Sequence, residues 1–241
     1  MRGQVFLLGL NIICDIVNTV KQTKNLIIFG ISNVISDLMD AAQLNGLRIK
    51  TIVMNQPEVL RERTRSIHDR IRRIHPTPDI IGLEAFSPGD NEVYATGTTS
   101  PAKSHMVEKL KRDFGIEFLT MVHPTACVSS MASMEEGVFV GANSAVGAET
   151  SVRSHAFINR GVTIGHDSII GEYARLSPGC NIGGHVRIGR AAMIGMGANV
   201  IQELVVGDEA VVAAGAVVIS DVSEKTLVAG IPAKLKKQYG A

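Results

Sequence analysis

The sequence predicts two domains: an α/β domain with a short parallel sheet, followed by a parallel β-helix built from six-residue repeats. In the second half, an aliphatic residue recurs at every sixth position from Val128 to Val218 without a break. In the first half, short apolar runs alternate with segments of helical spacing, an order typical of parallel sheets with helical crossovers. We therefore expect an N-terminal helical extension over 1–24, the α/β domain over 25–122 and the repeat domain over 123–241.

The six-residue period indicates which backbone the second half adopts. A helix repeats every 3.6 residues and a strand every 2, so a period of six fits short strands that turn once per repeat. Glycine often follows the aliphatic residue, and a small residue usually stands four places after it. Such repeats build solenoids, and three sides of six residues give a triangular prism with 18 residues per coil. Coils then stack about 4.8 Å apart, with the aliphatic residues along the axis.

The small-residue position settles how we interpret one cysteine. Cys180 falls in that position, which Ala174 occupies one repeat earlier and Ala192 two repeats later. A thiol packed near a prism corner behaves as a small apolar group. We predict a buried, unreactive Cys180 and not a nucleophile. At the end of the repeats, the segment GIPAKLKK (230–237) is suited to cap the last coil, and its lysines could also meet the phosphates of a ligand.

The first half yields a set of expected elements. Strands are expected at 25–30, 47–54, 79–86, 91–97 and 116–122, and helices at 33–46 and 100–115, the latter with Pro101 at its first position; the charged segment 61–75 is compatible with a helix. Ligands of such sheets bind at the carboxyl ends of strands. Gly30, Ser32 and Asn33 form the loop after the first strand, and Asn55 and Gln56 end the second. Both segments fit a nucleotide site, and both fit plain polar turns.

Composition excludes several classes of protein. The chain has 241 residues, 45% of them hydrophobic, and a net charge of +1, without the basic excess of a nucleic-acid-binding protein. Three scattered cysteines, Cys14, Cys127 and Cys180, fit neither a disulfide framework nor a zinc spacing, so we expect a cytoplasmic, reducing location.

The apolar stretch at residues 5–14 raises the question of a membrane segment. It is too short to span a bilayer, which takes about 20 apolar residues, and it lacks a cleavage site for a signal peptide. We expect a short packed helix and no membrane insertion. A start codon assigned too far upstream would also explain the stretch.

Three motifs resemble a known family. MVHPTACVS (121–129), INRGVTIGHDSIIGEYARLSPGCNIGGHVRIG (158–189) and VAGIPAKLKK (228–237) are similar to segments of the left-handed β-helix acyltransferases that acetylate nucleotide-linked amino sugars. That family is often grouped with the sialic acid O-acetyltransferases. The resemblance spans about residues 25–238, and in the first half it is one of topology alone.

The resemblance implies a function and a set of site residues. It implies a homotrimer with acetyl-CoA between neighbouring prisms, no metal, and a Rossmann-like domain that holds a nucleotide-linked amino sugar for glycan synthesis. It implies a histidine base followed by an acid, His166 and Asp167, and a substrate-binding asparagine, Asn159. The positions that line the CoA channel in the family correspond to Gly184, Met196 and Ala214.

Three departures from the family pattern affect ligand binding. The loop GISNVIS (30–36) replaces a glycine- and histidine-rich loop, and Asn55-Gln56 replaces an acidic pair, so the identity of the nucleotide stays open. A second histidine nine residues after the base is replaced by Arg175. This change concerns the acyl donor, and we assign Arg175 to acetyl-CoA binding.

The expected chemistry explains why a histidine is needed. A sugar amine must lose a proton to attack a thioester, and imidazole can take it near neutral pH. Asp167 can orient the ring. One coil away on either side stand Ala148 and Gly184, whose small size leaves room for the thioester, and the Gly184 N–H can point at its carbonyl oxygen. We predict direct transfer without an acyl-enzyme. The alternative for His166 is an exposed turn residue.

The other histidines are expected to lie outside the catalytic site. His155 and His185 are expected to point outward, as surface or subunit-contact residues; His123 belongs to the domain junction; His68, His75 and His105 are solvated.

Competing functions are O-acetylation of a sugar hydroxyl, a zinc-dependent hydratase using His155, His166 and His185, and a non-catalytic trimeric scaffold that binds nucleotide-sugar. The three histidines occupy different repeat positions, which argues against a shared metal.

Overall fold

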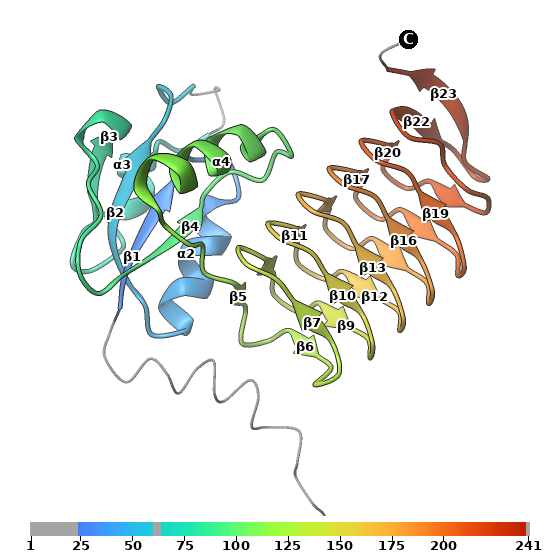
Figure 1. The fold of residues 1–241 in the computed structure, drawn as a ribbon, viewed down its shortest axis with the longest axis horizontal. Helices are drawn as coiled ribbons and strands as arrows, with labels where there is room; N and C mark the ends of the chain where they lie inside the picture. Colours follow the sequence, from blue (N-terminus) through green and yellow to red (C-terminus); the bar gives the residue numbers. More distant parts are fainter. Residues whose placement is uncertain (1–23, 60–63, 240–241) are drawn as a thin grey trace, which may run out of the picture.

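The computed structural model describes residues 24–59 and 64–239, in two domains (Figure 1). The expected N-terminal extension and Cys14 lie outside the described residues, except for Lys24. The elements before the prism are the strands β1 (Asn25–Phe29), β2 (Arg48–Met54), β3 (Asp79–Gly82) and β4 (Glu92–Thr96), the helices α2 (Ile35–Leu44), α3 (Ile67–Ile71) and α4 (Lys103–Phe114), and the 3-10 turn η1 (Leu83–Ala85).

The first domain is a parallel α/β sheet of strand order β3-β2-β1-β4. Its strands are apolar because both faces are covered, with Leu26 and Ile28 packed toward α2 and Ile27 and Phe29 toward α4. The chain order reverses between β1 and β4, where such sheets bind ligands. The positions of β1, β2, β4 and α2 agree with the sequence-based expectation.

Two local expectations for this domain were wrong, and a third was met in part. The last helix begins at Lys103 and not at Pro101, because residues 100–102 form a turn in which Lys103 N–H donates to the Ser100 carbonyl at 2.9 Å. The charged segment 61–75 does hold a helix, but in its described residues the helix is short, α3, and is capped by Ser66. The expected strand 116–122 does not extend the sheet beyond a bridge at Phe118, and β5 (Met121–Val122) pairs with the prism instead.

The second domain is the predicted triangular prism, a left-handed parallel β-helix (Figure 1). We call its three sides the docking sheet, the polar sheet and the side sheet. The docking sheet comprises β5, β8 (Phe139–Val140), β11 (Phe157–Ile158), β14 (Arg175–Leu176), β17 (Met193–Ile194), β20 (Val211–Val212), β22 (Thr226–Ala229) and β23 (Lys234–Gln238). The polar sheet comprises β6 (Cys127–Val128), β9 (Ala145–Val146), β12 (Thr163–Ile164), β15 (Asn181–Ile182), β18 (Asn199–Val200) and β21 (Val217–Val218). The side sheet comprises β7 (Ser133–Met134), β10 (Ser151–Val152), β13 (Ile169–Ile170), β16 (Arg187–Ile188) and β19 (Val205–Val206).

The register of the prism confirms the predicted coil. Ser151 pairs with Ile169 and Thr163 with Asn181, each 18 positions further on. The aliphatic residues of the repeat are buried from Val140 to Val218, and those of the first coil are partly buried. At about 1.5–3 kcal/mol for each buried aliphatic side chain, this axis supplies most of the domain's stabilisation. β23 runs antiparallel to β22 at the last coil.

The small-residue positions lie at the corners, as predicted. Cys180 is buried there, and burial raises the pKa of its thiol to about 12, which keeps it protonated. Where the position holds a hydroxyl, as at Ser144 and Ser168, the hydroxyl donates to a carbonyl of the next coil at 2.7 and 3.0 Å. Gly165 shows why glycine follows the aliphatic residue: a Cβ there would lie 2.5 Å from the backbone nitrogen of Gly184.

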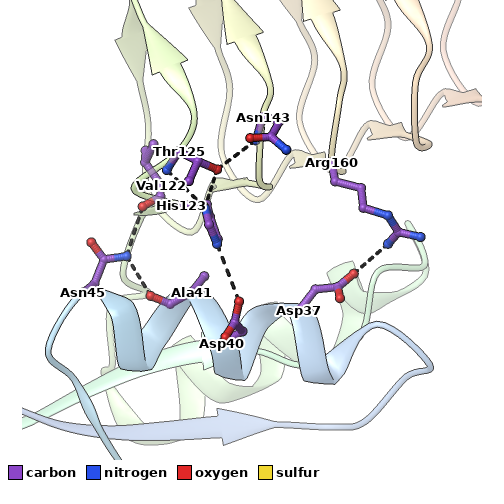
Figure 2. A network of polar contacts seen from close by, with 9 residues as sticks. All are labelled: Asp37, Asp40, Ala41, Asn45, Val122, His123, Thr125, Asn143 and Arg160. Atoms are coloured by element: carbon purple, nitrogen blue, oxygen red, sulfur yellow. Dashed lines mark hydrogen bonds and ion pairs between the residues drawn. The ribbon is translucent and has the colours of Figure 1, made fainter.

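The α/β domain packs on the docking sheet and on the two prism edges beside it. Phe139 and Phe157, which point outward from the docking sheet, belong to the same apolar cluster as α2. Figure 2 shows the polar contacts of α2 with the prism: Asp37 pairs with Arg160 at 2.9 Å, and Asn45 donates to the Val122 carbonyl at 3.0 Å.

The domain junction also holds two histidines. His123 lies at the junction, as expected, with Nε2 3.7 Å from Asp40 and Nδ1 2.9 Å from the Thr125 hydroxyl (Figure 2). His155 is buried inside the chain and not on its surface, which corrects the expectation. It is 2% exposed and stacks on Tyr173. An isolated solenoid would expose this corner, and the docked domain buries it.

Candidate active site on two edges of the prism

His166 and Asp167 lie on the corner between the polar and side sheets, which we call the His166 edge. Asp167 adopts the left-handed backbone conformation (φ 56°), which turns the chain from β12 to β13. Its carboxylate lies 2.7 Å from His166 Nδ1. Because an ionised carboxylate only accepts hydrogen bonds, Nδ1 carries the proton in this contact, and the lone pair is left on Nε2.

The imidazole of His166 lies over the backbone of the next coil. A Cβ added at Gly184 would be 2.9 Å from His166 Nε2, so glycine leaves room for the ring in this position. The Gly184 carbonyl accepts from Glu203 N–H at 3.0 Å, and in the described part of the chain the Gly184 N–H donates to no backbone acceptor. The His166 side chain is 63% exposed. The edge thus presents an exposed imidazole beside a backbone N–H that has no backbone acceptor among the described residues.

A second imidazole stands on the same edge, one coil further on. His185 points outward, and its Nε2 lies 3.9 Å from Asp167 Oδ2. Its ring meets that of His166 edge to face, with centroids 5.1 Å apart. The sequence-based reasoning placed His185 on the surface and assigned it no partner. The sequence did contain a signal for this contact, because His185 stands 19 residues after His166, one more than a coil.

Three of the other predicted site residues share a different edge. Asn159, Met196 and Ala214 lie on the corner between the docking and polar sheets, which we call the Asn159 edge. Asn159 is buried, and its side-chain oxygen accepts from Arg160 N–H at 2.8 Å. Met196 and Ala214 are exposed. The polar sheet separates this edge from His166.

Arg175 does not join either group. It projects from the docking sheet, between Phe157 and Met193, and is half-buried. Its Nε is buried without a hydrogen-bond partner among the described residues. Within one chain, Arg175 therefore lies on the side that the α/β domain covers, away from His166.

The predicted ligand loops of the α/β domain lie together at a cleft. Gly30 has φ 73°, and the Ser32 hydroxyl donates to the Gly97 carbonyl at 2.7 Å, which ties the loops after β1 and β4 together. Ser32, Asn33 and Asn55 line a cleft of about 270 Å³. Gly30 borders it, since a Cβ on Gly30 would lie 3.2 Å from the Asn55 side-chain oxygen.

Sequence reasoning missed several residues of this cleft. Thr98, Arg65 and Arg70 also line it. Arg70 donates to the Ser36 hydroxyl at 2.8 Å, so α3 is held against α2. The glycine-threonine pair at the end of β4 was the available signal for Thr98, because it stands at the reversal of strand order. The segment 61–75 carries too many arginines for the sequence to single out two of them.

Within a single chain, the cleft of the α/β domain and His166 lie on different sides of the prism. The α/β domain contacts the prism through the docking sheet and its two bordering edges, as at Glu136 and Arg160. The His166 edge is the one edge that does not border the docking sheet. No contact between the two domains in the described ranges reaches it.

The chain resembles known proteins in structure more than in sequence. Neither a scan with protein-family models nor a search of curated proteins finds a match to the sequence. Solved structures match along nearly the whole chain. PerB from Caulobacter crescentus, in complex with CoA and GDP-perosamine, has a TM-score of 0.74 and 24% identity, covering 90% of this chain and 99% of that chain.

Two further structures have the same architecture. The acetyltransferase domain of PglB from Neisseria gonorrhoeae FA1090, in complex with acetyl coenzyme A, has a TM-score of 0.72 and 25% identity, covering 89% of this chain and 100% of that chain. WeeI from Acinetobacter baumannii AYE has a TM-score of 0.65 and 19% identity, covering 88% and 99%.

These comparisons define the class of protein by its fold. The chain is an α/β domain joined to a left-handed hexapeptide-repeat β-helix. It has the fold of the hexapeptide-repeat sugar acetyltransferases, as the sequence motifs predicted. Within the described ranges, no helix is both long and apolar enough to cross a membrane.

Proposed function

We propose that this protein transfers an acetyl group from acetyl-CoA to the amino group of a nucleotide-linked amino sugar. The observation that carries the proposal is the exposed His166–Asp167 pair, with 2.7 Å between Nδ1 and Oδ2, on an edge where glycine leaves space beside the ring. Similar structures were solved with CoA and GDP-perosamine and with acetyl coenzyme A. This fold and this base together favour acyl transfer.

The proposed reaction is a direct transfer. The amine nitrogen attacks the thioester carbonyl carbon while its proton passes to His166 Nε2, and Asp167 stabilises the imidazolium that forms. The Gly184 N–H donates to the oxyanion of the tetrahedral intermediate. The C–S bond then breaks, and the proton on Nε2 neutralises the departing CoA thiolate. Each atom and proton is accounted for without an acyl-enzyme.

We further propose that neighbouring chains share each site, in a homotrimer. The argument is the separation described above: the cleft and the Asn159 edge lie on one side of the polar sheet, and His166 lies on the other. The outward residues of that sheet are small or polar from β6 to β18, and Thr163, Asn181 and Asn199 form a hydrogen-bonded ladder along it. If polar sheets of neighbouring chains face each other, the His166 edge of one chain meets the Asn159 edge of the next.

The cleft of the α/β domain is the proposed nucleotide site. Its amides and hydroxyls suit a base and ribose, and its two arginines suit phosphates. Gly30, Ser32, Asn33 and Asn55 would contact the nucleotide, and Asn159 the sugar. Acetyl-CoA would lie along Gly184, Met196 and Ala214, with Arg175 kept as a predicted contact. We keep the cytoplasmic location and the role in glycan synthesis as part of the proposal.

The test identifies the acceptor whose acetylation releases CoA from acetyl-CoA. Purified protein is screened by thermal shift with UDP-, dTDP-, GDP- and CMP-linked sugars, and then assayed for CoA release with amino and hydroxyl forms of the sugar that binds. We expect release with the amino form. Release only with the hydroxyl form would reassign the protein to O-acetylation. Binding of a nucleotide-sugar without CoA release from any acceptor would identify a non-catalytic binding protein.

A further inference from the structure

The His166 edge carries a group of side chains that the transfer reaction does not use in full. His166, Asp167 and His185 each offer one ligand atom, and these atoms lie within 4.8 Å of one another. Two imidazoles and a carboxylate are a donor set that zinc prefers, in contrast to the all-oxygen sets of Mg²⁺ or Ca²⁺. In the described ranges, no other histidine, cysteine or carboxylate group gathers in this way.

The backbone under these side chains is fixed by the coil. Asp167 N–H donates to the Ala148 carbonyl at 2.9 Å, and His185 N–H donates to the His166 carbonyl at 2.9 Å. Asp167 and His185 share the left-handed conformation at equivalent corners, with φ of 56° and 57°. The three Cα positions are thus held by hydrogen bonds between successive coils, and only side-chain rotations are needed to adjust the ligand atoms.

The required adjustment is small. Ligand atoms in a tetrahedral zinc site lie about 3.3 Å apart, given metal–ligand distances near 2.0–2.1 Å. Here His166 Nδ1 is 2.7 Å and His185 Nε2 is 3.9 Å from Asp167 Oδ2. The side chains of His166, Asp167 and His185 are 63%, 43% and 55% exposed, which leaves them free to rotate.

We propose that His166, Asp167 and His185 bind one Zn²⁺ ion, and that the bound ion inhibits the enzyme. The ion takes the place of the proton between His166 Nδ1 and the carboxylate, and its fourth position is left to water. Neutral imidazole bound through Nδ1 carries its proton on Nε2. Nε2 then has no lone pair to accept the proton of the attacking amine. Binding is independent of the proposed function, whereas inhibition depends on it.

The binding test uses the metal alone. Full-length protein stripped with EDTA is titrated with zinc chloride by isothermal titration calorimetry, with magnesium chloride as the comparison ion. We expect one zinc ion per chain and no heat from magnesium. His185→Asn should raise the zinc Kd by at least about tenfold, because it removes a direct ligand. His105→Asn, which changes an exposed histidine of α4, is the matched control and should leave the Kd unchanged.

The activity test separates this proposal from the proposed function. We expect zinc to inhibit CoA release by the unaltered protein and to inhibit His185→Asn at least about tenfold more weakly. If acetyl transfer occurs but zinc binding does not depend on His185, the metal site is wrong and the transferase stands. If zinc binds through His185 but no acceptor is acetylated, the transferase is wrong and the site stands. Activation by zinc would overturn the inhibitory role.

Discussion

The prism and the α/β domain differ in how their sequences determine structure. In the prism, each side of a coil repeats one six-residue pattern, and the strands from β5 to β21 pair with strands 18 residues away. In the α/β domain, strands of different lengths pair across helical crossovers, with an irregularity in the β1–β2 register. The repeat specifies a scaffold with little ambiguity. Ligand chemistry depends on residues that depart from any repeat, in the corners and in the loops.

The same contrast applies within a single coil. Inward positions hold aliphatic residues throughout, whereas corner positions vary from glycine to histidine and glutamate. A substitution at an exposed corner residue therefore changes chemistry with little effect on folding, and one on the axis does the reverse. The predictions below test that division, from the largest expected effect to the smallest.

Replacing His166 with alanine should have the largest effect on activity. Loss of a general base typically lowers the rate about 10²–10⁴-fold, which is about 3–5 kcal/mol of transition-state stabilisation. His166 is an exposed corner residue, so we expect the melting temperature and the oligomer mass by light scattering to stay unchanged. His105→Ala, at an exposed histidine of α4, is the control. Full activity of His166→Ala would refute the base assignment.

Replacing Leu176 with alanine should have a large effect on stability. Leu176 is completely buried on the prism axis, and such truncations cost about 2–5 kcal/mol through lost burial and the cavity left behind. Ile52→Ala, at a completely buried residue of β2, is the matched change in the other domain. Calorimetry will show whether the two variants lower one shared transition or two separate ones. A Leu176→Ala loss below about 1 kcal/mol would contradict the axis packing.

Much of this fold could be predicted because the determining signals are local. The aliphatic at every sixth position, the corner glycines and the small Cys180 slot each follow from the geometry of one coil. The His166–Asp167 contact joins adjacent residues, and the resemblance to a known family singled out this pair. Because its signals are also local, the strand and helix pattern of 25–54 was predicted well.

The expectations that were wrong depend on contacts between distant segments. His155 is buried because α4 and Phe118 pack against its corner, and a sequence periodicity contains no information about a docked domain. The strand β5 joins the prism because Phe139 and Phe157 extend the apolar surface across the junction. Arg70 lines the cleft because it stands on α3, a helix too short to predict from sequence periodicity. The grouping of His166 with His185 required the register of two coils.

Acid should weaken the junction between the two domains through His155. Burial, followed by the nearby charge of Lys103, lowers the pKa of His155 to about 4. Between pH 6.5 and about 4 the unfolded chain binds the proton and the folded chain does not, so stability falls as the pH falls through this window. The loss is at most on the order of 3 kcal/mol, and the window follows from the single shift of His155.

The check is a comparison of unfolding at pH 7 and pH 4.5. His155→Phe keeps an aromatic ring between Phe118 and Tyr173, which contact the imidazole at centroid distances of 5.3 and 5.1 Å. It removes the titrating group, so we expect its stability to change less over this pH range than that of the unaltered protein. Equal pH dependence in the two proteins would mean that other groups account for the acid sensitivity.

The smallest effect is expected for the ion pair that joins the first turn of α2 to the Asn159 edge. Asp37 and Arg160 lie 2.9 Å apart, but their side chains are 46% and 57% exposed (Figure 2). Exposed pairs contribute about 0.2–1 kcal/mol and are screened by salt. In a double-mutant cycle of Asp37→Asn and Arg160→Gln, we expect a coupling energy within that range that decreases at high salt. A salt-independent coupling above about 2 kcal/mol would show instead that this pair contributes substantially to holding the α/β domain against the prism.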